Sequence, residues 1–246
     1  MDRLIHTALS GMRASMDSQR VIASNMANAN TLGFRAEMLD QRAVTIEGQP
    51  NEARAMQTAS VRGANMAAGE IVQTGRDLDI AMATDALMAV QATDGTEAYT
   101  RRGDLSISAT GLLVNGEGLP VLGETGPITI PPTGFPAIAP DGTITLADPA
   151  TPDQPPAEIG RIKLAAWQGS PISKGLDGLF RVEGGGILPT DEAATVKVGA
   201  VEGSNVKTTE VLVEMIDAQR LFAMRSKVIS TAREIDESGA QLMRLG

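Results

Sequence analysis

The chain has 246 residues and a mass of 25.6 kDa, enough for one large domain or two modest ones. Its 30 acidic residues outnumber 21 Lys and Arg, and this net charge of −9 argues against binding to nucleic acids or anionic membranes. The absence of cysteine excludes disulfides and thiolate chemistry, and a single histidine, His6, excludes a multi-histidine metal site within one chain.

Charged residues are spread through the first 30 positions, which leaves no room for the apolar segment of a signal peptide. No apolar run reaches the 18 or more residues of a membrane span. We therefore expect a soluble chain with no membrane insertion and no cleaved signal. Aromatic residues make up only 2% of the chain, which disfavours an aromatic-lined cofactor pocket, so we expect no cofactor.

The N-terminal segment, residues 1–35, is predicted to be a long helix. It contains no proline, and its apolar residues are spaced alternately by four and three positions, as in a coiled-coil seam. The members of this row are Ile5, Leu9, Met12, Met16, Ala23 and Met26, with Gln19 as a polar interruption. Gly33 can adopt the left-handed conformation that stops a helix.

Residues 36–74 have weak periodicity and are predicted to form an extended connector. Residues 75–200 are predicted to be one antiparallel β domain, because all but one of the 13 prolines lie there and β-branched segments alternate with turn signals. Four Asx-Gly pairs suit hairpin turns. They are Asp94-Gly95, Asn115-Gly116, Asp141-Gly142 and Asp177-Gly178. The segments expected to be strands include 128–130, 143–146 and 162–164.

Residues 201–246 are predicted to form the second long helix, since the stretch 204–238 has neither glycine nor proline. One seam contains Leu221, Val228, Ile235 and Leu242, interspersed with Ala218, Arg225, Ala232 and Gly239. A second apolar row beside it contains Leu212, Met215, Phe222 and Ile229. The fold class predicted is therefore α+β, with the terminal helices burying one seam against each other in a coiled-coil-like domain. What covers the second row is left open.

Candidate chemistry is sparse along the chain. Asp77 and Asp79 alternate around Leu78 and resemble paired carboxylates, but a solvated face of an edge strand explains them better. The run Gly184-Gly185-Gly186 lacks the residues of a phosphate-binding loop and is best explained as a flexible turn. His6 is best explained as a surface residue. We therefore expect no catalytic residue, no metal site and no enzymatic activity.

Four ordered motifs resemble the flagellar rod and hook protein family. The segment 24–35 resembles the ANNLANxxTxGFK signature of its N-terminal region, and 201–206 with 214–222 resembles its C-terminal region. Segments 72–81 and 98–105 resemble its central signatures. The residues that carry these motifs are Asn25, Asn28, Thr31, Gly33, Phe34, Gly75, Asp79, Tyr99, Gly103, Gly203, Asn205 and Gln219. The chain departs from the family at 83–88, where a Gly-x-Gly-Phe-Phe run is common, and at Ala223, where glutamate is frequent.

The resemblance implies a subunit of the basal-body rod, most similar to a proximal-rod member, with a distal-rod or hook-type subunit as the alternative. It implies export without a cleaved signal by the flagellar type III export apparatus and helical polymerisation into a torque-transmitting shaft in the periplasmic space. Partners would be proximal and distal rod subunits and near-homologous copies of the chain, with no nucleic acid. We expect the assembly interface at Ile5, Leu9, Met12, Met16, Met26, Leu221, Phe222, Val228, Ile235 and Leu242. A second hypothesis is a binding module whose termini form an intramolecular coiled coil.

Overall fold

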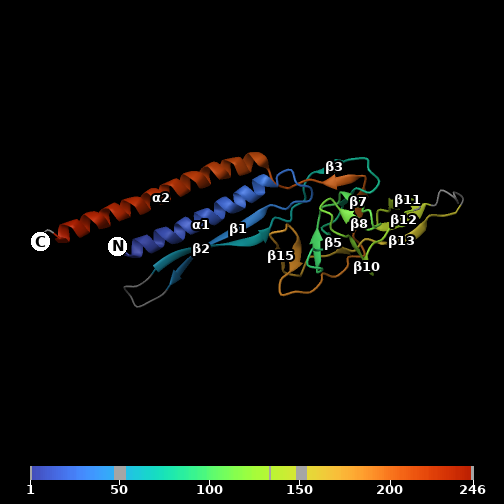
Figure 1. Cartoon of the computed structure of the whole chain (residues 1–246), viewed down its shortest axis with the longest axis horizontal. Coiled ribbons are helices and arrows are strands. Elements are labelled where there is room, and N and C mark those ends of the chain that lie inside the picture. The colour runs from blue at the N-terminus through green and yellow to red at the C-terminus, as the bar shows by residue number, and fades with distance from the viewer. Residues whose placement is uncertain (1, 47–53, 133, 148–153, 245–246) are drawn as a thin grey trace. The chain divides into compact units, whose positions relative to one another are not determined.

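The computed structural model describes residues 2–46, 54–132, 134–147 and 154–244. The chain divides into two compact units (Figure 1). The first, called here the helical unit, comprises Met1–Ala29, Glu37–Gly63 and Val206–Gly246. The second, the β unit, comprises Asn30–Ala36 and Ala64–Asn205. Both ends of the chain therefore belong to one unit, and the middle forms the other.

The helical unit contains the helices α1 (Asp2–Ala27) and α2 (Thr208–Arg244), which run antiparallel side by side (Figure 1). Strands β1 (Glu37–Ile46) and β2 (Arg54–Ala64) pair with each other, and β1 packs on α1. The segment 36–74, for which the sequence predicts an extended connector, thus supplies a two-stranded sheet to this unit. α1 ends at Ala27, before the predicted limit of residue 35, and a turn follows it up to Gly33.

The β unit is built from short antiparallel strands. In chain order these are β3 (Ile71–Gln73), β4 (Ile80–Met82), β5 (Leu87–Gln91), β6 (Glu97–Thr100), β7 (Leu105–Ile107), β8 (Leu113–Asn115), β9 (Leu122–Gly123), β10 (Gly126–Pro127), β11 (Phe135–Ile138), β12 (Thr143–Ala147), β13 (Ala157–Arg161), β14 (Leu164–Ala165), β15 (Ile172–Lys174), β16 (Phe180–Val182), β17 (Val196–Val198) and β18 (Ala200–Glu202). One sheet has the strand order β14-β5-β6-β16-β15, another has β11-β12-β13, and the other strands of this unit pair two by two.

Strand β5 explains where the core of the β unit lies. Successive side chains of a strand point to opposite faces, and here both faces are buried. Leu87 packs with Tyr99 and Phe180 in one apolar cluster, whereas Met88 belongs to the larger cluster that also contains Ile144. The α+β class and the antiparallel strands predicted from the sequence are confirmed.

The predicted turns and strands match the structure unevenly. Asp94-Gly95, Asp141-Gly142 and Asp177-Gly178 each lie in the turn of an antiparallel pair, in loops longer than the two residues expected. In each the aspartate Oδ1 accepts a bond from the amide two residues on. Segment 143–146 lies in β12, but 128–130 makes only an isolated bridge. Among the described residues, no helix is apolar over a stretch long enough to cross a membrane.

Candidate assembly site

The inner face of the helix pair is made of small and polar residues. Ser15 on α1 is buried, and Arg225 of α2 donates hydrogen bonds to the Ser15 hydroxyl and to the Gly11 carbonyl. One turn further along, Gln19 Nε2 of α1 donates to the Ala218 carbonyl at 3.4 Å. Small side chains allow two helices to approach closely. Because this face has few large apolar residues, the apolar periodicity did not predict it.

The apolar row predicted to lie between the helices instead points largely outward on α1. Leu9 is 38% exposed and Met16 is 56% exposed, while Met12 and Met26 are half-buried. The prediction that this row forms the seam with α2 is therefore corrected, because the close contact uses the small residues one position along the helix. The side chain of Ile5 lies outside the residues whose side chains are described.

On α2 the predicted seam divides between two faces. Ala218 and Arg225 face α1, as their hydrogen bonds indicate, whereas Leu221 (40%), Val228 (59%) and Ile235 (52%) are exposed. Phe222 of the second apolar row is half-buried. The side chain of Leu242 lies outside the described residues. The two helices therefore carry large exposed apolar side chains, a pattern that marks protein–protein contact sites.

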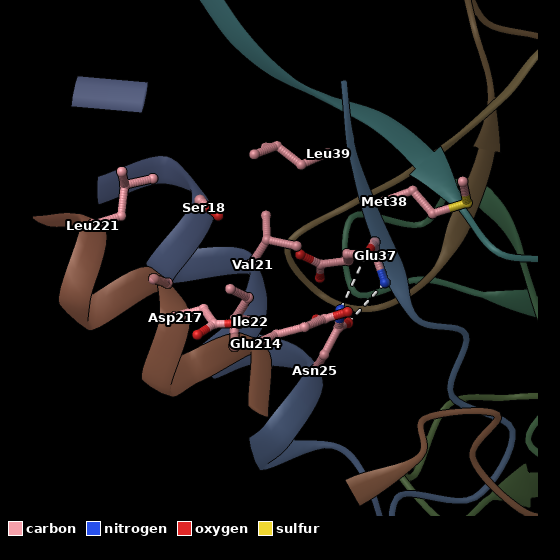
Figure 2. A pocket seen from close by; sticks show the side chains of 11 residues that line it. Ser18, Val21, Ile22, Asn25, Glu37, Met38, Leu39, Glu214, Asp217 and Leu221 are labelled. Atoms are coloured by element: carbon pink, nitrogen blue, oxygen red, sulfur yellow. Dashed lines mark hydrogen bonds between the residues drawn. The ribbon is translucent and has the colours of Figure 1, made fainter. Parts of the chain in front are cut away.

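A groove of about 540 Å³ lies between α1, β1 and α2, all within the helical unit (Figure 2). Its apolar lining includes Val21 and Ile22, which are buried, and Met38 and Leu221, which are exposed. Three carboxylates also line it. These are Glu37 of β1 and Glu214 and Asp217 of α2. The lining of the groove thus combines apolar side chains with three carboxylates.

Asn25 holds the start of β1 to the end of α1. Its Oδ1 accepts a hydrogen bond from the Glu37 amide at 2.7 Å, and its Nδ2 donates to the Glu37 carbonyl at 3.0 Å (Figure 2). The side chain of Asn25 thereby bonds to both backbone groups of Glu37, as the backbone of a neighbouring strand would. Ser24 adds a bond from its hydroxyl to the Glu37 carboxylate at 3.0 Å, and Asn28 Nδ2 donates to the Ser24 carbonyl.

A buried ion cluster lies in the β unit. The Glu202 carboxylate accepts hydrogen bonds from Arg35 Nη2 at 2.5 Å, from Arg101 Nε at 2.6 Å and from the Gly69 amide at 2.7 Å. Arg101 also donates to carbonyls of β4 and the following loop, including that of Met82. Burial lowers the pKa of Arg35, and Glu202 opposes that shift.

Asn205 ties together the chain segments by which the β unit begins and ends. Its Oδ1 accepts from the Ala36 amide at 2.8 Å, and its Nδ2 donates to the carbonyls of Asn65 and Ala67 at 2.7 and 2.8 Å. Its own amide donates to the Phe34 carbonyl at 3.3 Å. Segments 34–36, 65–67 and 205 are therefore joined by a single side chain. We call Asn205 with the Glu202 cluster the clamp.

Other motif residues have equally specific structural roles. Gly33 has φ +68°, and a Cβ there would lie 2.4 Å from the Arg102 amide nitrogen. A Cβ on Gly103 would lie 1.8 Å from the Ile80 carbonyl oxygen. The Phe34 ring lies under Lys174, whose Nζ is 3.4 Å from the ring centroid, which is a cation–π geometry. Gly75 has φ +73° and donates its amide to the Gly199 carbonyl, and Gly203 donates its amide to the Glu70 carbonyl.

Asp79 corrects a sequence expectation. It is 2% exposed rather than on a solvated strand face, because Asp77 and Leu78 form a turn and Asp79 makes an isolated bridge to Asp104. Its Oδ2 accepts from the Thr74 hydroxyl at 2.7 Å. Asp79 thus serves the structure of the β unit.

Tyr99 is also fully buried, and its hydroxyl donates to Glu97 at 2.6 Å and accepts from the Leu188 amide. Burial, with the bond to Glu97, raises the pKa of this hydroxyl. Thr31 is half-buried and Gln219 is exposed on α2. No group of three or more potential metal ligands occurs among the described residues.

Sequence reasoning missed the charged members of the clamp. Arg35, Arg101 and Glu202 each stand beside a motif residue, but the glutamate is 167 positions from Arg35 and 101 from Arg101. One signal was present, because each of these charged residues lies inside one of the motif segments. Nothing in one sequence says that these segments meet.

Comparison with known proteins gives one consistent answer. Residues 5–35 match the family described as "Flagella basal body rod protein", residues 81–146 match "Flagellar hook protein FlgE/F/G D1 domain", and residues 197–242 match "Flagellar basal body rod FlgEFG protein C-terminal". The chain is 40% identical over its full length to the full-length flagellar basal-body rod protein FlgF of Salmonella typhimurium, and equally to that of Escherichia coli. It is 32% identical to FlgG of Agrobacterium fabrum, with 95% of this chain and 96% of that protein covered.

Proposed function

The chain belongs to the FlgF family of flagellar basal-body rod proteins, and from this we propose that it is a structural subunit of the proximal rod that assembles through the outward faces of its two terminal helices. The observation that carries the mode of assembly is the row of exposed apolar side chains on α1 and α2. The subunit transmits torque and catalyses no reaction.

Burial of these side chains between subunits would supply the cohesion. Fully burying one Leu, Ile or Met contributes about 1.5–3 kcal/mol. Leu9, Met16, Leu221, Val228 and Ile235 are all at least 38% exposed. On each helix these residues are seven positions apart, a heptad spacing that suits coiled-coil-like packing, which we place between subunits rather than within one. Partners are proximal and distal rod subunits and further copies of the chain.

The location and route follow from the same proposal. The subunit lies in the part of the basal body that spans the periplasmic space and reaches it through the flagellar type III export apparatus. Export in an unfolded state is supported by the absence of cysteine, since no disulfide has to form before or after transit. A distal-rod or hook-type role is the alternative within the same family.

The test replaces Leu221 by aspartate. A charge at this position is tolerated by the monomer, where the side chain is exposed, but would have to be desolvated in a subunit contact. We expect loss of rod assembly and of motility in a host whose own copy is replaced by the variant. The control is Leu176→Asp, because Leu176 is exposed in the β unit. Normal motility of the Leu221→Asp strain would contradict assembly through this face.

A further inference from the structure

The outer face of α1 carries a stripe in which apolar and basic residues alternate. Leu9, Arg13, Met16 and Arg20 are all exposed and follow one another by four, three and four positions. Residues with this spacing share one face of a helix. Ser18, Ile22 and Asn25, which line the groove, lie on the opposite face of the same helix. We call the first set the basic stripe.

The exposed face of α2 carries the complementary pattern. Asp217, Leu221, Met224 and Val228 are exposed and are likewise spaced by four, three and four. Asp217 and Leu221 also line the groove, and Glu214 adds a second carboxylate there. We call these residues, with Glu214, the acidic stripe. Neither Glu214 nor Asp217 makes an ion pair within the described part of the chain, and the same holds for Arg13 and Arg20.

We propose that the basic stripe of one copy packs antiparallel on the acidic stripe of a second copy. If Met16 lies opposite Leu221, then Arg20, four residues on, falls opposite Asp217, four residues back. Leu9, seven residues back, falls opposite Val228, seven residues on. The register therefore pairs Met16 with Leu221, Leu9 with Val228 and Arg20 with Asp217. Arg13 falls opposite Met224, and Glu214 falls opposite Ala23. This inference rests on the proposed function and names the partner of its outward faces.

The same register runs within one chain. Gln19 lies by Ala218 and Arg225 by Gly11 and Ser15, so the intramolecular and intermolecular pairings place the same levels of α1 and α2 side by side. In the proposed contact each copy offers the basic stripe of α1 to one neighbour and the acidic stripe of α2 to another, and these are two different surfaces. A contact of this kind is heterologous, so it propagates from copy to copy, and it builds an open helix of subunits where the rotation between copies does not close a ring.

Charge complementarity at this contact makes a test by exchange of charges possible. Variant one carries Arg13→Glu and Arg20→Glu, and variant two carries Glu214→Arg and Asp217→Arg. In each variant alone the two stripes have like charge, so we expect self-association of the purified full chain, measured by sedimentation velocity, to weaken at least about tenfold. In an equimolar mixture the acidic α1 of variant one meets the basic α2 of variant two, and association should return.

Two controls keep the result specific. The matched control is Arg220→Glu with Lys227→Glu, which changes the net charge as variant one does, on exposed positions of α2 outside both stripes. It should associate as the unchanged chain does. Circular dichroism of each variant checks that the helices form, and the mixture checks it independently, since misfolded chains would not restore each other.

Because the chain has no cysteine, the register can be checked by crosslinking. A chain carrying Met16→Cys, mixed with a size-tagged chain carrying Leu221→Cys, should form a disulfide-linked pair on oxidation, because a disulfide requires Cα atoms within about 7 Å. Met16→Cys mixed with Lys227→Cys should not.

Failure of this proposal can be told from failure of the proposed function. A wild-type chain that stays monomeric, or a mixture of charge variants no more associated than its components, would overturn pairing between copies. If Leu221→Asp nevertheless abolished motility, the outward face would still be an assembly face, occupied by a different rod subunit. If the charge exchange did not restore association and Leu221→Asp did not impair motility, the proposed assembly through these faces would be contradicted as well.

Discussion

At Glu202 one carboxylate serves two guanidinium groups, and Arg35, Arg101 and Glu202 are each almost completely buried. Two nitrogens of Arg35, Nε and Nη1, have no hydrogen-bond partner within the described structure. Burying charges is costly unless they are paired, and removing the single anion leaves two cations without compensation. The stability of the β unit is therefore expected to depend strongly on the Glu202 carboxylate.

Glu202→Gln should destabilise the β unit by about 3–5 kcal/mol, because the amide keeps the shape of the side chain but not its charge. The measurement is urea unfolding followed by the fluorescence of Trp167, which lies in the β unit. Glu158→Gln, at an exposed position of β13, is the matched control and should leave the midpoint unchanged. Equal midpoints for the two variants would mean that the charge at residue 202 is not needed.

Gly33→Val tests the second point at which a single residue is decisive. The backbone at φ +68° is unfavourable for a β-branched residue, and its Cβ would collide with the backbone of Arg101 and Arg102. We expect a loss of about 2 kcal/mol or more in the same unfolding experiment, and impaired rod formation in cells. Gly160→Val, in β13 with open space around the position, is the control. Normal rods from the Gly33→Val strain would contradict the assignment.

Among elements, the junction of α1 with β1 depends on Asn25, whose amide pairs with both backbone groups of Glu37. Asn25→Ala leaves a buried donor and acceptor unsatisfied and should cost about 1–3 kcal/mol. Hydrogen exchange of the Glu37 amide should accelerate in this variant, while the amides of the β unit keep their protection. Asn30→Ala, at an exposed position, is the control. Unchanged protection at Glu37 would show that Asn25 does not hold the strand.

The elements also show how far sequence reasoning reaches. The distribution of proline located both helices and the β region, because proline is excluded from helix interiors irrespective of what surrounds the helix. Asp94-Gly95 and Asp141-Gly142 marked turns because the glycines, at φ +83°, need the left-handed conformation. These signals are local, so a single sequence contains them in full.

What failed depends on contacts between distant residues. Apolar periodicity shows that Leu9 and Met16 share a face, but not whether α2 or another molecule covers it, and here α2 packs on Gly11 and Ser15 instead. In the same way, Asp79 is polar by composition, yet the turn before it buries its side chain. The identity of the partner of each face is a property of the fold, not of the segment.

For the whole molecule, the division into two units leads to a prediction about the monomer. The helical unit exposes apolar residues that we assign to subunit contacts, whereas the β unit has two buried apolar clusters of its own. Limited proteolysis of the dilute monomer should therefore cut within the first 35 and last 40 residues first and leave a resistant core near residues 75–200. Mass spectrometry of the fragments identifies the boundaries. Protection of both ends would favour the binding-module hypothesis instead.

The clamp also bears on how this architecture can vary. Because Asn205 bonds directly to Asn65 and Ala36, the places where the chain enters and leaves the β unit are neighbours in space. A segment whose two ends meet can be lengthened, shortened or exchanged without stretching the chain that carries it. The region between residues 64 and 205 can thus diverge in length and in its surface residues, provided that the Asn205 side-chain amide and the backbone groups it bonds are kept. The β unit can therefore change during evolution while the two terminal helices stay the same.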